Sequence, residues 1–150
     1  MDGVSAVFAV VSLGVQLVGT IREVIEFLRS VHNAPDEITR LVQVLDQLRG
    51  TLEHVKDLVQ QQSLILGLPG SFVSIASALR NCEKRIIKLE KLVHQLKRYV
   101  DRNYSFQKAW ATLKTVFKKE EIVELRGQLY EDMMALQLSI SINSTHLQYL

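Results

Sequence analysis

Apolar residues recur at alternating steps of three and four along two long stretches of the chain. One row is Ile38, Leu41, Leu45, Leu48, Leu52, Val55 and Val59, and the other is Leu79, Cys82, Ile86, Leu89, Val93, Leu96 and Val100. This spacing places each row on one narrow side of an α-helix, as in helices that pack nearly antiparallel in a bundle. Seven glycines and two prolines are too few for a turn-rich β fold. We therefore expect a single all-α domain over residues 1–150, a four- to five-helix up-down bundle with a hydrophobic N-terminal helix.

Helix-breaking and capping residues divide the chain. Pro35-Asp36-Glu37 suits a first helical turn, and Gly67-Leu68-Pro69-Gly70 suits a loop. Ser71 and Ser105 are candidate N-caps, and the acids after Lys119 suit a helix start. We expect helices over residues 4–31, 35–61, 71–102, 105–118 and 120–147.

The N-terminal segment carries no charge over the nineteen residues between Asp2 and Arg22. As a helix it would span about 28 Å, close to the roughly 30 Å of bilayer hydrocarbon. Acidic Asp2 and the lack of a small-residue cleavage site argue against a secretory signal. Gln16 and three glycines make the segment a marginal membrane span, one that could be stable in either environment.

A stripe of small or polar residues runs along the same segment, and the rest of its circumference up to residue 21 is apolar. We call this the polar stripe, and its members are Asp2, Ser5, Ala9, Ser12, Gln16, Gly19, Glu23, Glu26 and Ser30. So much apolar surface needs covering. One interpretation is a central bundle helix whose polar stripe is its one solvent-facing edge. The other, compatible with the first, is a helix stored in the bundle and released into a membrane.

Basic residues are concentrated in residues 80–119, which carry twelve Lys/Arg and three acids, whereas the rest of the chain has a net charge of −7. A cationic surface of this kind attracts an anionic partner or is simply a solvated helix face. Candidate contacts for anionic lipid, which lie off the second apolar row, are Lys84, Arg85, Lys88, Lys91 and Arg98.

Nucleic acid is the competing anionic partner, since aromatic residues interleave with lysines after residue 98. However, the spacing of Phe106, Trp110, Leu113 and Phe117 places them on one helix face, which favours a core role. We therefore expect no nucleic-acid partner.

Motifs for catalysis or metal binding are not found. His32, His54, His94 and His146 are scattered, and no phosphate-binding loop or nucleophile elbow occurs. Cys82 belongs to an apolar row, which predicts a buried small side chain. We expect no enzyme activity, no catalytic residue, no metal and no cofactor.

Three segments in this order resemble the fungal HeLo-like N-terminal domain, over essentially the whole chain. They are Met1-Asp2-Gly3-Val4-Ser5 with the apolar run to Val18, Ala34-Pro35-Asp36-Glu37-Ile38 with its Leu-rich helix, and the stretch from Trp110 to Ile122. Such domains are helical bundles at the N-terminus of NLR-type receptors or of proteins with an amyloid signalling motif, and are similar to necroptosis-executioner bundles.

The resemblance implies a cell-death execution domain, cytoplasmic at rest, that oligomerises with itself and permeabilises the plasma membrane. Its partners would be anionic membrane lipids, other copies, and an NLR-type or amyloid-motif module on this or another chain. Membrane insertion would fall to Val4, Val7, Phe8, Val10, Val11, Leu13, Val15, Leu17 and Val18. The alternative is a homotypic interaction or adaptor domain with no membrane activity of its own.

Overall fold

The computed structural model describes the backbone of residues 3–31, 34–65, 73–101, 105–116 and 119–148, and the side chains of 8–31, 34–61, 74–100, 105–111 and 120–141. Within these ranges the chain forms five helices and no strand: α1 (Gly3–Arg29), α2 (Asp36–Ile65), α3 (Val73–Asp101), α4 (Phe106–Val116) and α5 (Lys119–Gln148). The predicted all-α fold is confirmed. The predicted boundaries agree closely except that α2 runs four residues past its predicted end.

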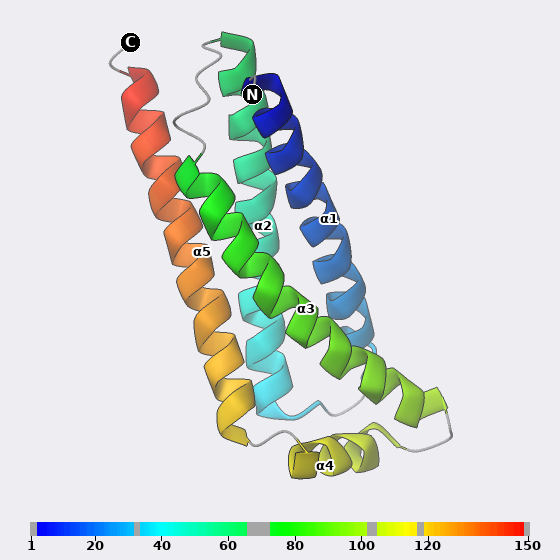
Figure 1. Cartoon of the computed structure of the whole chain (residues 1–150). Helices are drawn as coiled ribbons and strands as arrows, with labels where there is room; N and C mark the ends of the chain where they lie inside the picture. Colours follow the sequence, from blue (N-terminus) through cyan, green and yellow to red (C-terminus); the bar gives the residue numbers. More distant parts are fainter. Residues whose placement is uncertain (1–2, 32–33, 66–72, 102–104, 117–118, 149–150) are drawn as a thin grey trace.

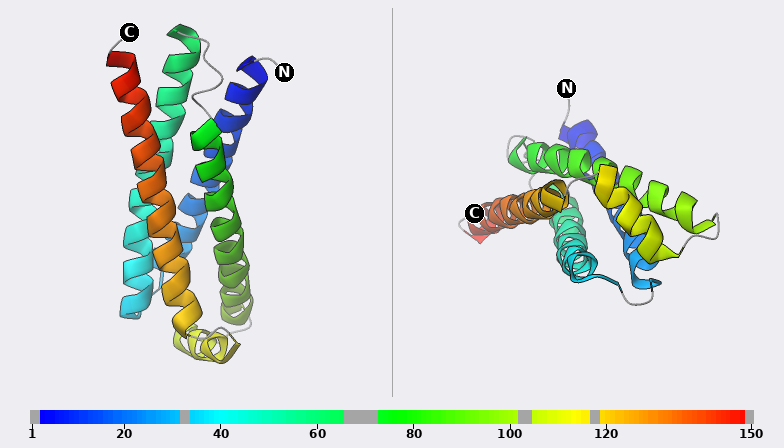
Figure 2. Two further views of the ribbon diagram at one scale, coloured as in Figure 1. Left: turned by 60° about the vertical axis from the view of Figure 1, so that its left-hand side comes forward. Right: turned by 90° about the horizontal axis from the view of Figure 1, so that it is seen from below.

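The four long helices run alternately up and down, and each packs mainly on two of the other three (Figures 1 and 2). Helices α1 and α5 each contact both α2 and α3, so the four form a closed ring around one core. Short α4 lies across one end and packs on α3. The start of α1 and the end of α5 lie at the opposite end.

Both apolar rows form the core. Every member of the row in α2 is buried, as are six of the seven members in α3, the exception being half-buried Val100. Cys82 is fully buried, as its place in the row predicts. Removal of these side chains from water is the main source of stability in such a bundle.

Two of the predicted helix starts are visible as hydrogen bonds. The Pro35 carbonyl accepts from the amides of Ile38 and Thr39 at 3.0 and 3.1 Å. The Ser105 hydroxyl accepts from the Lys108 amide at 3.2 Å, which satisfies one of the free N–H groups at the start of α4. Ser71 lies outside the described residues.

Aromatic side chains close the end of the bundle beneath α4. Phe106 lies between Phe27 and Trp110, with ring centroids 6.4 and 6.2 Å away, and the Lys97 ammonium lies 5.3 Å from the Phe27 ring. Trp110 is buried, as its helical spacing predicts, so its ring is not available to stack on a base. The side chains of Leu113 and Phe117 lie outside the described ranges.

Candidate functional site

The exposed side of α1 is wider than the polar stripe. Every described member of the stripe from Ala9 to Ser30 is exposed, as predicted. Beside it, Phe8 and Val15 are also exposed, with 74% and 53% of their surface accessible. The first helix is therefore not wrapped on most sides. Since each helix of the ring has two main neighbours, much of the circumference of α1 stays open.

The predicted membrane-inserting residues fall into two groups. Phe8 and Val15 face solvent, and Val11 and Leu13 are half-buried. The core holds the others that can be placed: Val10, Leu17 and Val18. Val4 and Val7 belong to α1, but their side chains are outside the described ranges. Insertion of the whole set into lipid would require α1 to give up its packing on α2 and α3.

Residues Phe8–Arg29 are long and apolar enough to cross a membrane, by length and composition. Core helices of water-soluble proteins, which are mostly buried, and N-terminal signal sequences share this length and composition. Here only 39% of the apolar window is buried inside the protein. A partly covered helix of this composition loses less buried apolar surface, and therefore less stabilisation, on leaving the bundle than a central helix would.

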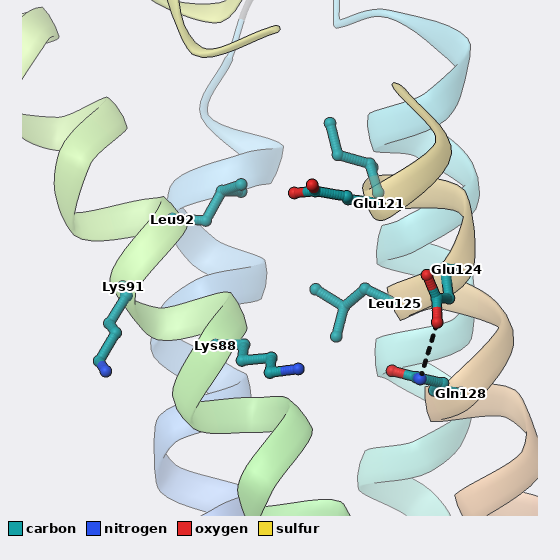
Figure 3. Close-up of a pocket in the computed structure, with 8 residues that line it drawn as sticks. Lys88, Lys91, Leu92, Glu121, Glu124, Leu125 and Gln128 are labelled. Atoms are coloured by element: carbon teal, nitrogen blue, oxygen red, sulfur yellow. Dashed lines mark hydrogen bonds between the residues drawn. The ribbon is translucent and has the colours of Figure 1, made fainter. Parts of the chain in front are cut away.

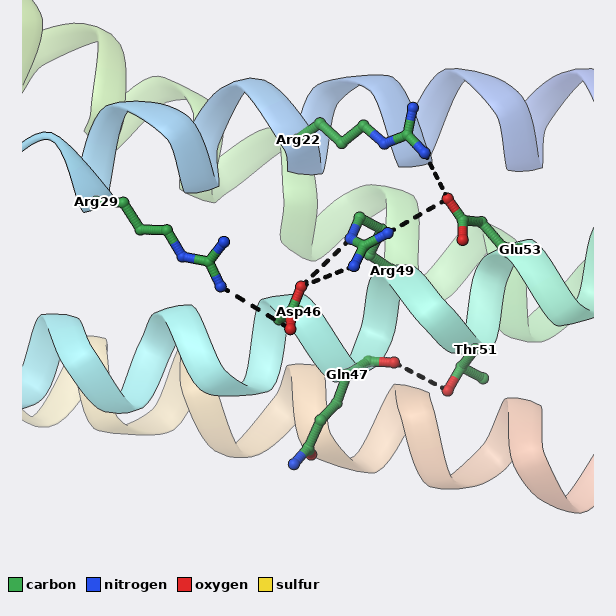
Figure 4. Close-up of polar contacts among 7 residues, drawn as sticks. All are labelled: Arg22, Arg29, Asp46, Gln47, Arg49, Thr51 and Glu53. Atoms are coloured by element: carbon green, nitrogen blue, oxygen red, sulfur yellow. Dashed lines mark hydrogen bonds and ion pairs between the residues drawn. The ribbon is translucent and has the colours of Figure 1, made fainter.

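The second half of α1 is fixed to α2 by a ladder of charges (Figure 4). Arg22 lies 2.7 Å from Glu53, and Arg29 lies 3.9 Å from Asp46. Arg49 of α2 joins the two acids at 3.4 and 2.9 Å, and its guanidinium lowers the pKa of the Asp46 carboxyl. Exposed pairs of this kind contribute little to stability, because solvent screens the two charges. The uncharged first half of α1 lies beyond this ladder and is held mainly by apolar packing.

Four of the five predicted lipid contacts share one exposed side of α3. With Arg80 they form what we call the basic stripe: Arg80, Lys84, Lys88, Lys91 and Arg98. Arg85 lies apart from it, on the side that faces α5. Its Nε is 3.7 Å from Oδ2 of Asp132, and its guanidinium donates to the Asn81 carbonyl at 3.2 Å.

A groove of about 310 Å³ separates part of the basic stripe from α5. Figure 3 shows Lys88 reaching across it toward α5, whereas Lys91 points away. Its lining combines apolar side chains with charges of both signs: Lys88, Lys91, Leu92, Glu121, Ile122, Glu124, Leu125 and Gln128.

Asp132 and Cys82 are titratable groups buried between α3 and α5. Burial raises the pKa of Asp132, and the nearby Arg85 only partly opposes this. Burial, with the charge of Asp132, raises the pKa of the Cys82 thiol to about 12, so the thiol is protonated at neutral pH.

We expect Asp132→Asn to flatten the pH dependence of stability above pH 3.8, the ordinary pKa of this carboxyl. The folded pKa is raised, so the folded protein holds the proton more tightly than the unfolded chain. Stability from this group is therefore full at low pH and declines as pH rises through the interval between the two pKa values. Urea denaturation at a series of pH values measures it. Asp46, whose pKa is lowered, acts in the opposite direction but is present in both proteins. Parallel curves for the two proteins would contradict the prediction.

A set of exposed apolar residues on α5 was missed by the sequence analysis. Val123, Tyr130, Met134 and Leu138 are all exposed, Leu138 to 62%. Their steps of seven, four and four place them on one side of the helix. The opposite side is also apolar, with Leu129, Met133 and Leu136 in the core. Apolar residues on two sides of this helix are the sequence pattern from which the exposed set could have been predicted.

The described residues include no group of three or more His, Cys, Asp or Glu side chains arranged to hold a metal ion.

Comparison with known proteins gives one match. The model of the SesA family, described as an N-terminal domain on NACHT NTPases and P-loop NTPases, matches residues 11–136. No curated protein and no solved structure matches the chain.

Proposed function

Because the chain belongs to the SesA family of N-terminal domains on NACHT and P-loop NTPases, we propose that it is the signalling domain of such a protein and that activation releases α1 into a membrane. The family supports the interpretation of the chain as an N-terminal helical domain of an NLR-type protein. A C-terminal NTPase module is the partner that fits such a domain. Membrane permeabilisation, cell death, the HeLo-like subtype and the move from cytoplasm to plasma membrane are the further content of the proposal.

The observation that carries the proposal is the exposure of Phe8 and Val15 on a helix of membrane-spanning length. Exposure of these side chains to water is unfavourable, and their transfer into lipid would lower the free energy. Release would remove the core contacts of the buried residues Val10, Leu17 and Val18, and this loss opposes release. The bilayer would again surround them with an apolar environment, which offsets part of the loss. The two locations of α1 are therefore close enough in free energy for a trigger to select one.

The experiment is leakage of a trapped dye from vesicles of anionic phospholipid. We expect the full chain to release dye, and deletion of residues 1–21 to abolish release. High salt should weaken the activity, since exposed lysines such as Lys84 and Lys91 would attract headgroups by about 1 kcal/mol each. Leakage unchanged by the deletion would overturn the mechanism.

The second candidate is an adaptor domain that assembles copies or partners while α1 stays in the bundle. The apolar side of α5 favours it, because patches of this kind mark interaction surfaces. Self-association without any leakage would support the adaptor and contradict the membrane proposal.

A further inference from the structure

The exposed side of α5 combines apolar and acidic residues. Glu120, Glu124 and Glu131 are exposed beside the apolar set of Val123, Tyr130, Met134 and Leu138. We call this surface the acidic-apolar face. Its apolar members are exposed, and Glu124 also lines the groove that Lys88 reaches across.

The exposed side of α3 has the opposite charge. The basic stripe presents five cations, whereas Glu83 and Glu90, the acids among the described side chains of α3, are half-buried. Ile87 is exposed beside the stripe, which gives this side of α3 an apolar element as well. The two surfaces lie on different helices, so one molecule carries both halves of a complementary pair.

We propose that the acidic-apolar face of one copy docks on the basic stripe of a second copy. The inference goes beyond the proposed function: it adds an assembly of copies and identifies the contact surfaces. Opposite charges steer the two faces together, and the apolar side chains supply burial at the centre.

Charge favours this occupant over others. A membrane of anionic lipid would be repelled by Glu120, Glu124 and Glu131, so α5 is not a headgroup surface. Two antiparallel copies of α5 packed face to face would bring the same acidic flank of each helix together. A face that binds a different face of its neighbour forms a heterologous contact, which repeats into a ring or a filament.

The docking leaves α1 free. Neither surface includes the exposed side of α1, so each copy in the assembly could still release its first helix. The basic stripe cannot hold a headgroup and a neighbouring α5 at the same time. Headgroup binding therefore applies to copies whose stripe is uncovered.

Sedimentation equilibrium of the purified chain tests the docking. We expect association that grows with concentration up to about 1 mM and weakens between about 0.05 M and about 0.5 M salt. The double variant Glu124→Lys, Glu131→Lys should weaken it at least tenfold without changing the melting temperature, because both side chains are exposed. The matched control, Glu23→Lys with Asp57→Lys, makes the same charge change on exposed positions of α1 and α2 and should leave association unchanged.

Mixing identifies the heterologous contact. The double variant Lys84→Glu, Lys91→Glu should also associate at least tenfold more weakly alone, yet regain association when mixed with the Glu124→Lys, Glu131→Lys protein. A wild-type chain that stays monomeric throughout, or an α3 variant that alone associates as strongly as wild type, would overturn the docking. Vesicle leakage is read separately: association without leakage sustains the docking and overturns the membrane proposal, whereas leakage with monomers does the reverse.

Discussion

Val15→Asp and Val15→Lys should each abolish most of the vesicle leakage while leaving the fold intact. Val15 is 53% exposed on α1, so a charge there is solvated in the bundle and changes stability by about 0.5 kcal/mol. Near the middle of an inserted helix the same charge costs about 3 kcal/mol, or roughly 100-fold in the insertion equilibrium. The expected signature is an unchanged melting temperature with leakage reduced by roughly two orders of magnitude.

The two charges separate insertion from attraction. Lysine strengthens attraction to anionic vesicles and aspartate weakens it, but both block insertion. We therefore expect Val15→Lys to bind vesicles at least as well as wild type and still not release dye. Two control variants should retain leakage. Val15→Ala adds no charge, and His54→Asp adds a charge at an exposed position of α2. Full leakage by Val15→Lys would mean that α1 does not cross the bilayer at this position.

The parts of the fold that follow from local rules could be predicted from the sequence. The apolar rows in α2 and α3 each fit one helical period, and their burial follows directly from that spacing. The same holds for the cap at Ser105, for buried Trp110 and for the exposed polar stripe of α1. Each of these depends on residues within one helix.

Features that depend on neighbouring helices could not be predicted. Phe8 and Val15 are as apolar as Val10 and Leu17, and only the positions of α2 and α3 decide which of them are covered. Arg85 belongs to the same basic sequence as Lys84 and Lys88, but it faces Asp132 of α5, a partner 47 residues away in the chain. Helix propensity and charge counts carry no information about such pairs.

Release of α1 depends on how strongly each half of the helix is held. The second half is held by buried Ile25 and Leu28, and the pairs Arg22–Glu53 and Arg29–Asp46 add exposed polar contacts to α2. Val10, Leu17, Val18 and Ile21 are the buried apolar residues described in the uncharged half, and Leu17 is the leucine among them. Its packing therefore contributes directly to the free energy that opposes release.

Leu17→Ala should raise vesicle leakage by at least roughly tenfold. Loss of a buried leucine costs the bundle about 2–5 kcal/mol, whereas the inserted helix loses only about 0.6 kcal/mol in lipid. The difference favours the released form, so a variant that is less stable in water is expected to be more active on membranes. Dye release and urea denaturation, measured on the same preparation, test both sides of this balance.

Leu129→Ala is the matched control for that gain. Leu129 is fully buried on α5, which packs mainly on α2 and α3, so its removal should lower stability by a similar amount without loosening α1. If leakage rises equally in both variants, unfolded protein rather than a released first helix damages the vesicles. If it rises only with Leu17→Ala, the packing of α1 against its neighbours is what holds the domain inactive.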